Sequence, residues 1–490
     1  FRSVVMDSDQ SLSVSTKVQY HLDVGSAYGT PKGTGWYDSG STAQFSVEPI
    51  VDQGNGTRRV FNGWWMNGRW TGGQASGSME MTGPMTLKSD WKKEHFFKVI
   101  SQYGSPSGEG WYQAGSTVTG LVQSPYPAEN GTRYVATGYT GTGSAPSSGK
   151  DASVTFALTL PGIVTFSWKT QHFLWASSSH GSPEGEDWYD AGSVASFSAP
   201  TVVSGGEGSR YLFTGWRGSG PGSYTGSLSK ASVTVNSRII ETADWVLQYH
   251  LKVASPYGEP TGEGWYASGS SATSSVTSPA PGPAGTRYIV TSYQGTGSAG
   301  SGMGTSVTFT VSSVSSVAWI WKAQHLVTLA TSPANVTTPS GAGWYDSGVN
   351  VQISTPPEVS GGEDVRYMFQ NWTGTPSPVP PESGTSSVLA VTPCCLTANY
   401  LTQYRLTVSS EYGNPTGGGW CEAGSSVEFS VTSPWPAQKD IRYVVTQYTG
   451  DAQGEGSTGT VLMRGPRGVA FNWKKQYYLL VQNGGHGTAS

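Results

Sequence analysis

Apolar and polar residues alternate along most of this chain, and no stretch keeps a helical period. In the run 317–329, which contains no glycine or proline, Trp321 and Ala323 share one face of a period-2 strand, and Lys322 and Gln324 share the other. A slip of one residue would turn the apolar face to solvent. A flexible linker would need glycine, serine or proline. The run is therefore predicted to be one strand that leads from one internal repeat into the next.

This joint recurs along the chain, aligned on the residue that follows a recurring Gln, or Glu94 in one copy. The aligned residues are Tyr20, His95, His172, Tyr249, His325, Tyr404 and Tyr477, spaced by 75, 77, 77, 76, 79 and 73 residues. They divide the chain into six complete repeats, at 20–94, 95–171, 172–248, 249–324, 325–403 and 404–476. Residues 1–19 match the end of a preceding repeat, and residues 477–490 match the start of a following one. These ends suggest a window from a longer repetitive polypeptide, or a subunit whose ends complete each other head to tail.

Two landmarks sit at a fixed distance within every repeat. A Trp, followed by Tyr in all copies but the last, recurs at Trp36, Trp111, Trp188, Trp265, Trp344 and Trp420. An Arg recurs 22 residues later, at Arg58, Arg133, Arg210, Arg287, Arg366 and Arg442. The length changes fall after this Arg, so we expect the Trp-to-Arg part to be core and the variable part to be loop.

Each repeat is predicted to contain five strands, which in the fourth copy lie near 249–255, 271–277, 287–293, 305–311 and 317–324. Odd repeats carry Trp after the Arg strand, and even repeats carry Tyr in its place. The predicted fold is an all-β linear array of about six small five-stranded repeats, each a sandwich or a barrel. The repeats are fused by continuous strands and alternate in two types.

The amino-acid composition and charge argue against two classes of protein, those that bind nucleic acid and those that span a membrane. Charged residues make up 12% of the chain and its net charge is −4, which leaves no basic footprint for nucleic acid. No run approaches the roughly 20 apolar residues of a membrane span, and residues 1–15 lack the order of a signal peptide. We expect no nucleic-acid partner and no membrane span in this chain.

Four sequons point to the cell exterior. Asn55, Asn130, Asn335 and Asn371 each begin an Asn-x-Thr triplet, and the first three lie in stretches typical of loops. These four asparagines are the candidate N-glycosylation sites of the chain.

Three cysteines exclude a disulfide scaffold. Outside the cell, one of Cys394 and Cys395 is expected to form a disulfide with Cys421. Alternate residues of a strand share a face, and Cys394 is favoured because it shares the face of Tyr400. Buried free thiols are the alternative.

The 19 tryptophans invite a sugar-stacking interpretation, but most recur at positions that alternate with polar residues, as core side chains do. Trp65, Trp70, Trp175 and Trp435 break the pattern and are the better candidates for surface contacts.

The other recurring polar residues are interpreted as structural. The joint histidines are interpreted as polar tips on half-buried strands, because Tyr replaces them in other copies. The recurring Arg is expected to pair with loop carbonyls or with a carboxylate such as Glu109, Asp187 or Glu263. Calcium at the loop acids Asp38, Asp190 and Asp346 remains an alternative to solvated turns. No cofactor and no metal ligand set is predicted, and no catalytic motif was found.

The order of the short motifs carries a resemblance. Tyr-x-Leu-x-Val is followed by Gly-Trp-Tyr-x-x-Gly-Ser, Arg-Tyr-x-Phe-x-Gly-Trp, Ser-Val-Thr-Val and a closing Trp-Lys, and the repeat 172–248 shows much of this order, although Val246 replaces the closing Lys. The pattern resembles the divergent internalin-type B-repeats of bacterial and archaeal surface proteins. The resemblance implies an extracellular β-rich array of the kind found in adhesins, envelope proteins and stalks, without enzymatic activity. Long Trp-rich arrays of this type also resemble archaeal sheath or surface-layer proteins.

These observations lead to one functional hypothesis and one alternative. We expect an extracellular, cell-surface structural protein that is not an enzyme and that self-assembles into a sheath, a surface layer or a fibre. Its partners are then copies of itself, with glycans or other envelope proteins as additional ones. The alternative is a surface adhesin or a carbohydrate-binding stalk.

Overall fold

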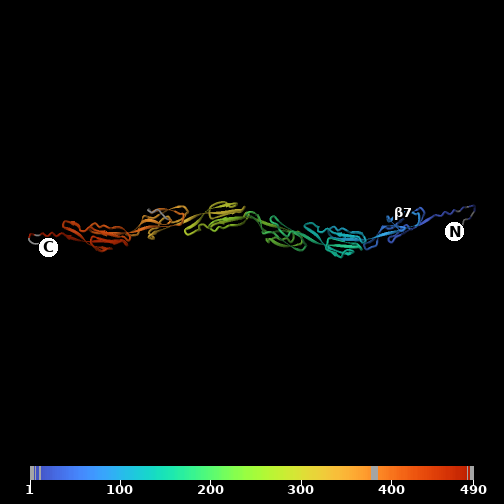
Figure 1. The fold of residues 1–490 in the computed structure, drawn as a ribbon, viewed down its shortest axis with the longest axis horizontal. Coiled ribbons are helices and arrows are strands. Elements are labelled where there is room, and N and C mark those ends of the chain that lie inside the picture. The colour runs from blue at the N-terminus through green and yellow to red at the C-terminus, as the bar shows by residue number, and fades with distance from the viewer. Residues whose placement is uncertain are drawn as a thin grey trace. The chain divides into compact units, whose positions relative to one another are not determined.

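A computed structural model of the 490-residue chain describes residues 5, 7–9, 11, 13–376, 384–482 and 484–485. Within these residues the chain forms strands and no helix (Figure 1), so the predicted all-β class is confirmed. Contacts divide the chain into two compact units, Phe1–Ser204 with Tyr211–Val246, and Gly205–Arg210 with Leu247–Ser490.

The strands up to the third predicted repeat are β1 (Gln19–Gly25), β2 (Gly35–Asp38), β3 (Thr42–Ser46), β4 (Ile50–Asp52), β5 (Thr57–Met66), β6 (Arg69–Gly72), β7 (Ser76–Glu80), β8 (Met85–Ile100), β9 (Gly110–Gln113), β10 (Thr117–Leu121), β11 (Tyr126–Pro127), β12 (Thr132–Gly143), β13 (Ser148–Gly149), β14 (Ser153–Ala157), β15 (Gly162–Ser178), β16 (Asp187–Asp190), β17 (Ser193–Ser198), β18 (Val202–Gly206), β19 (Ser209–Ser219), β20 (Lys230–Val235) and β21 (Ile239–Ala254).

The strands that follow are β22 (Gly264–Ala267), β23 (Ser271–Ser275), β24 (Ala280–Pro281), β25 (Thr286–Thr296), β26 (Ser306–Thr310), β27 (Ser315–Ser332), β28 (Gly343–Asp346), β29 (Asn350–Ser354), β30 (Glu358–Ser360), β31 (Val365–Thr375), β32 (Thr385–Leu389), β33 (Cys394–Ser409), β34 (Gly419–Glu422), β35 (Ser426–Ser430), β36 (Trp435–Gln438), β37 (Ile441–Gly450), β38 (Gly454–Glu455), β39 (Thr458–Leu462) and β40 (Arg467–Tyr477).

The fourth repeat shows how the strands are layered. The end of β21 runs parallel to the start of β27, with Leu251 opposite Ser315, while β25 runs antiparallel to β27 and β22 pairs with β21. These strands form one layer, and the antiparallel pair β23 and β26 forms the other. Leu251, Val317 and Trp319 of the first layer pack against Ala272 of the second. The repeat is therefore a two-layer sandwich rather than a barrel.

Six clusters of buried apolar side chains lie along the described residues, and each falls inside one of the predicted repeat ranges. The alternation read from the sequence explains them. In β27, Val317 and Val327 are fully buried while Lys322 is exposed. Inward apolar residues thus supply the core, and outward polar residues face water.

The joints are continuous strands. β8, β15, β21, β27 and β33 are 16 to 18 residues long, and each crosses one of the predicted repeat boundaries. In β27, the first part pairs antiparallel with β25 of the repeat that ends, and the last part pairs parallel with β33 of the repeat that begins. One strand therefore serves two neighbouring sandwiches.

The prediction of five strands per repeat is wrong in its count. In the fourth repeat the structure adds β22, which holds the Trp-Tyr pair, and the two-residue β24. Both are too short to show a period in the sequence. Parts of the two predicted end segments lie outside the described residues. Among those that are described, β1 begins at Gln19 and β40 ends at Tyr477.

Candidate functional site

The recurring Arg and Trp meet at the joints. Arg287 lies opposite Gln324 across the pair of β25 and β27, and its Nε donates a hydrogen bond of 2.8 Å to Gln324 Oε1. Its guanidinium carbon lies 4.4 Å from the ring centroid of Trp344, in the following repeat. A planar cation over an indole face is attracted by the ring quadrupole. The side chains of one repeat therefore hold the first hairpin of the next.

Gln324 extends this contact to the other side of the shared strand. Its Nε2 donates to Asp346 Oδ1 over 2.7 Å, and Lys322 Nζ lies 2.7 Å from Asp346 Oδ2. The hydrogen bonds from Lys322 and Gln324 lower the pKa of the Asp346 carboxyl below its ordinary value. We call Arg287, Gln324 and Trp344, and the equivalent triples elsewhere, the joint clamp.

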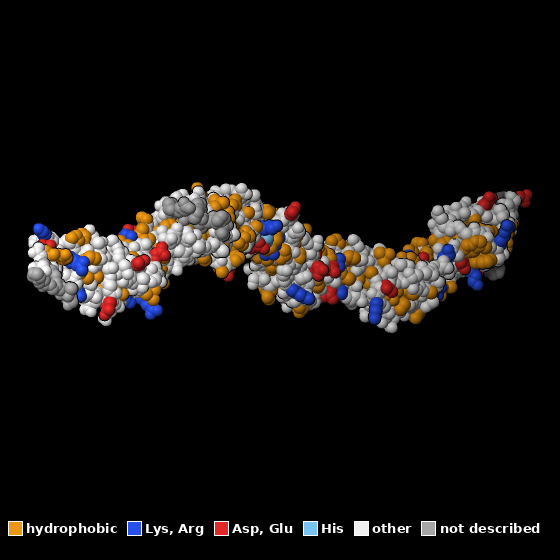
Figure 2. All heavy atoms as spheres, turned by 60° about the vertical axis from the view of Figure 1, so that its left-hand side comes forward, with side chains coloured by type: hydrophobic (Ala, Val, Ile, Leu, Met, Phe, Trp, Pro, Cys, Tyr) orange, Lys and Arg blue, Asp and Glu red, His pale blue; other side chains and the backbone are white. Residues whose placement is uncertain are grey.

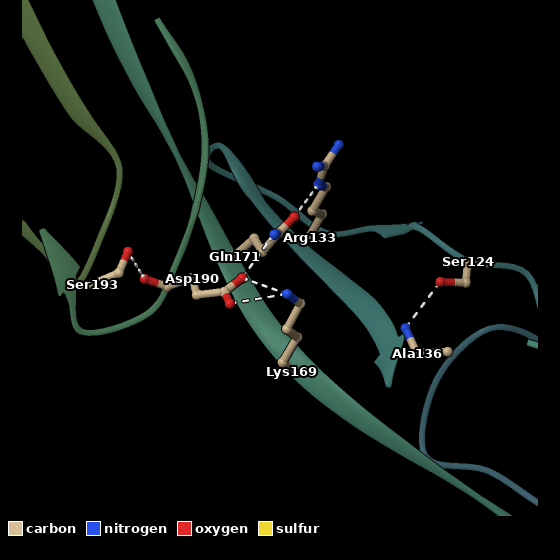
Figure 3. Close-up of polar contacts among 7 residues, drawn as sticks. All are labelled: Ser124, Arg133, Ala136, Lys169, Gln171, Asp190 and Ser193. Atoms are coloured by element: carbon tan, nitrogen blue, oxygen red, sulfur yellow. Dashed lines mark hydrogen bonds and ion pairs between the residues drawn. The ribbon is translucent and has the colours of Figure 1, made fainter. Parts of the chain in front are cut away.

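Figure 3 shows the corresponding hydrogen bonds of Arg133, Gln171 and Lys169 between the second and third repeats. Arg133 Nε donates to Gln171 Oε1, Gln171 Nε2 donates to Asp190 Oδ1, and Lys169 Nζ reaches the same carboxylate. The stacking recurs at five joints with distances from guanidinium carbon to ring centroid of 4.3 to 4.6 Å, in the pairs Arg58–Trp111, Arg133–Trp188, Arg210–Trp265, Arg287–Trp344 and Arg366–Trp420. Glu94 replaces Gln beneath Arg58 and forms an ion pair of 2.8 Å with it.

The expected arginine partners are mostly wrong. Glu109 and Glu263 accept hydrogen bonds from the backbone N–H groups of Val99 and Val253, and Asp187 accepts one from the backbone of Trp188. These acids therefore fix their own hairpins. The partner found in the other five copies is the strand Gln, and Arg366 also forms an ion pair of 3.6 Å with Glu358. The recurrence of this Gln at the joints was the signal in the sequence that could have identified it.

The tryptophans of the Trp-Tyr pairs are not core residues, which corrects the expectation for this set. Trp111, Trp188, Trp265 and Trp344 are half-buried beneath the arginines, and Trp420 is more exposed. The tyrosines beside them pack against the cores instead. Other tryptophans are buried as expected, namely Trp64, Trp216, Trp319 and Trp372.

The tryptophans that break the repeat pattern lie nearer the surface. Trp65 and Trp70 are each 41% exposed, on the hairpin of β5 and β6, with ring centroids 5.6 Å apart. Trp175 is 47% exposed beside Phe173, whereas Trp435 is half-buried.

The three loop acids considered for calcium hold basic and amide groups of the strands. Asp38 accepts from Lys17 and Gln19, in the way that Asp190 and Asp346 accept from their Lys and Gln. The described part of the chain contains no group of three or more His, Cys, Asp or Glu residues able to hold a metal ion.

The joint histidines bond to threonines. Nδ1 of His95, His172 and His325 lies 3.1 to 3.2 Å from the hydroxyls of Thr57, Thr132 and Thr286. Burial lowers the pKa of His95, which is 1% exposed. Each of these contacts ties the joint strand to the Arg strand that pairs with it.

The four sequon asparagines are all exposed. Asn55 and Asn130 have φ of 51° and 55° and are followed by glycines with positive φ, and this pair of angles defines a type I′ turn that favours Asn-Gly. Asn335 also lies in a turn, with φ of 63°, while Asn371 lies on β31 and accepts a hydrogen bond from Asn399. Turn geometry thus gives the Asn-Gly pairs a structural reason, and glycosylation remains a prediction.

The predicted bridge between Cys394 and Cys421 is wrong within one chain. Cys421 pairs with Tyr404, and Tyr404 lies ten residues beyond Cys394 on β33. At roughly 3.3 Å per residue the two are about 33 Å apart, far beyond disulfide reach. All three thiols are free, and burial raises the pKa of Cys394. Strand parity did place Cys394 on the buried face.

One buried carboxyl stands out, and the sequence reasoning missed it. Glu241 is fully buried in the third repeat, and its Oε1 accepts a hydrogen bond of 2.7 Å from Tyr224 N. Its Oε2 has no hydrogen-bond partner among the described residues. The aligned residues in the other repeats are buried and apolar, namely Leu87, Val164, Val317, Leu396 and Val469. The repeat alignment could have revealed it.

Glu241 is expected to make the third repeat less stable as the pH rises. Burial raises the pKa of its carboxyl in the folded chain, and the Tyr224 hydrogen bond offsets this only in part. The unfolded chain ionises from about 4.5, the ordinary glutamate value, so stability falls from there up to the raised pKa and then levels off. Glu241→Gln should match the wild type at pH 4 and be more stable by about 1 kcal/mol or more at pH 8.

Urea unfolding at both pH values measures this difference. Glu186→Gln, at an exposed position of the same repeat, is the matched control and should change neither value. A wild-type stability that does not fall between pH 4 and pH 8 relative to Glu241→Gln would contradict a raised pKa.

No protein-family model matches this chain, and no curated protein matches it either. The resemblance to internalin-type repeats therefore remains a prediction. No helix among the described residues has the length and apolar character needed to cross a membrane.

Proposed function

We propose that this chain is an extracellular structural protein that self-assembles into a cell-surface sheath, surface layer or fibre, and that it has no catalytic role. The joint clamp is the observation that carries the proposal. The same stacking of Arg on Trp recurs at five joints, and at each of them it connects an Arg of one repeat to a Trp of the next, beside the strand that the two repeats share. Chains that bear load need connections of this kind, because a flexible linker transmits no bending force.

The surface chemistry supports close packing between copies. Charged side chains are scattered over the face drawn in Figure 2, and backbone and uncharged side chains cover most of it. With 12% charged residues and a net charge of −4, like-charge repulsion between copies is weak.

A carbohydrate-binding adhesin is the second candidate. The exposed pair Trp65 and Trp70 favours it, because two indole rings on one hairpin offer apolar faces to a sugar ring. Both rings come from the first repeat alone, whereas the joint clamp recurs throughout. We therefore rank this candidate second.

Electron microscopy of the purified full chain tests the proposal. We expect ordered tubes, sheets or fibres to form above a threshold concentration without any added ligand. A chain that stays monomeric at every accessible concentration would contradict the proposal. If that monomer also binds glycans and loses the binding in Trp70→Ala, the adhesin takes its place.

A further inference from the structure

The second layer of the sandwich in the fourth repeat leaves one strand edge open. In the fourth repeat, Val276 N donates to Thr305 O and Val311 N donates to Ser270 O. The odd-numbered residues of this strand thus direct their backbone groups toward β23, and Ser306, Thr308 and Thr310 direct theirs away from it. Among the described residues no strand, isolated bridge or backbone hydrogen bond reaches that outer edge of β26.

The opposite edge of the same two-stranded sheet is closed. Thr261 forms a bridge with Ser275 at one end of β23. Gly262, with φ of 93°, lies so close to β23 that an added Cβ would stand 2.2 Å from Thr273 O. The preceding loop therefore covers β23 from Thr273 to Ser275, whereas no such loop approaches β26 among the described residues.

The open edge recurs in the other unit. In the second repeat, Val122 N donates to Ala152 O and Leu158 N donates to Ser116 O. The backbone groups of Ser153 and Thr155 in β14 therefore face outward in the same way, whereas Ala157 O already accepts a hydrogen bond from Thr159 N. The strand β39 repeats the pattern in the sixth repeat, where Val431 N donates to Ser457 O and Met463 N donates to Ser425 O, so that Thr458 and Thr460 face outward while Leu462 O accepts from Arg464 N.

These edges lack the features that keep soluble sheets apart. Proteins protect an open edge with charged side chains, proline, a bulge or a covering loop. The sequences Ser-Val-Thr-Phe-Ala of β14, Ser-Val-Thr-Phe-Thr of β26 and Thr-Gly-Thr-Val-Leu of β39 contain no charge and no proline. Their registers with β10, β23 and β35 run without a shift. Each edge is thus a regular, neutral template for another strand.

We propose that copies of this chain associate side by side through antiparallel pairing of these open edges, chiefly β14, β26 and β39. Two identical edges are self-complementary under a two-fold axis, since each offers the donors and acceptors that the other needs. A single edge of five residues pairs weakly. A second copy carries the same series of edges and gains by multivalency, which an unrelated strand would not. This inference rests on the proposed self-assembly and names the surface that produces it.

The test compares two variants of the full chain that add the same charge. The double variant Thr155→Lys and Thr308→Lys places lysines on the open edges, one in each unit. The control, Thr119→Lys and Thr273→Lys, changes their direct cross-strand partners on the closed strands. Both variants break the same hydroxyl pairs, Thr119–Thr155 and Thr273–Thr308, each 2.8 Å apart, so their effects on folding are matched.

We expect the open-edge variant to raise the threshold concentration for assembly at least tenfold and the control to assemble like the wild type. Hydrogen exchange gives a second measure. The amides of Ser306, Thr308 and Thr310 should gain protection on assembly, and those of Val307 and Phe309 should not change.

Assembly of the open-edge variant at the wild-type threshold would overturn the inference and leave the proposed function intact. Equal impairment of both variants would also overturn it. If the wild type does not assemble at all, the proposed function fails, and the inference fails with it.

Discussion

Replacing Ala323 and Gln324 with glycine should destabilise β27 at the joint by about 3 kcal/mol. Each glycine in a strand interior costs roughly 0.5–1 kcal/mol, and the lost hydrogen bonds of Gln324 to Arg287 and Asp346 cost about 1 kcal/mol each. Both positions are half-buried and paired on the shared strand. The two neighbouring sandwiches keep their own cores, so the damage should stay local.

Limited tryptic cleavage after Lys322, which lies in the same strand, measures the local opening. When cleavage follows the population of the open form, 3 kcal/mol corresponds to cleavage about a hundredfold faster. The single variant Gln324→Ala is the matched control, because it loses the side-chain bonds but keeps a strand-compatible backbone. It should show a clearly smaller effect. Cleavage of the double variant at the wild-type rate would argue against a shared strand.

Arg287→Ala should destabilise the same joint by about 2 kcal/mol. The variant loses the stacking on Trp344, roughly 0.5–1 kcal/mol, and the hydrogen bond to Gln324, about 1 kcal/mol. It also leaves Gln324 Oε1 without its donor. In calorimetry we expect the midpoint of one transition to fall by about 5 °C or more.

Two comparisons isolate the clamp from a general loss of charge. Arg442 makes the same hydrogen bond, to Gln476 over 2.8 Å, and no aromatic ring lies over its guanidinium in the part of the chain that the structure describes. Arg442→Ala should therefore cost less than Arg287→Ala. A double-mutant cycle with Trp344→Ala should give a coupling of about 0.5–1 kcal/mol. A coupling of zero would mean that the stacking does not hold the hairpin.

Strand identity was predictable because the residues that decide it are neighbours in sequence. The alternation of Trp321 and Ala323 with Lys322 and Gln324 identified β27 before any tertiary contact was known. The fixed spacing of Trp and Arg also identified two of the three members of the joint clamp, although not their contact. Period-2 patterning marks which face is buried, and a face is a local property.

The contact partners of these side chains were not predictable, because a contact between repeats is not a local property of the sequence. Arg287 meets a Trp that belongs to the following repeat, and nothing in the period of a strand says which repeat supplies the ring. The preceding-loop acids, such as Glu263, were chosen because they lie nearby in sequence, and the structure assigns them to backbone N–H groups instead. The same limit produced the disulfide error, because parity placed Cys394 on the right face but said nothing of its distance from Cys421 along β33.

The alternation of apolar and polar residues also did not predict the short strands or the pairing within the second layer. β22 has four residues, and its Trp-Tyr pair shows an apolar cluster without a period. The strands β23 and β26 were located, but their pairing, and with it the open edge of β26, depends on the register across the sandwich.

The central claim is that neighbouring repeats share one strand held by the joint clamp. Residue-resolved hydrogen exchange in the unaltered chain tests it most directly, at the amides of Gln324 to Leu326. Leu326 N donates to Gly285 O over 2.9 Å, and Arg287 and Asp346 flank Gln324 on its two sides. The account predicts that these amides exchange as slowly as those of the sandwich strands on either side. Exchange at the joint as fast as in the exposed loops would contradict it.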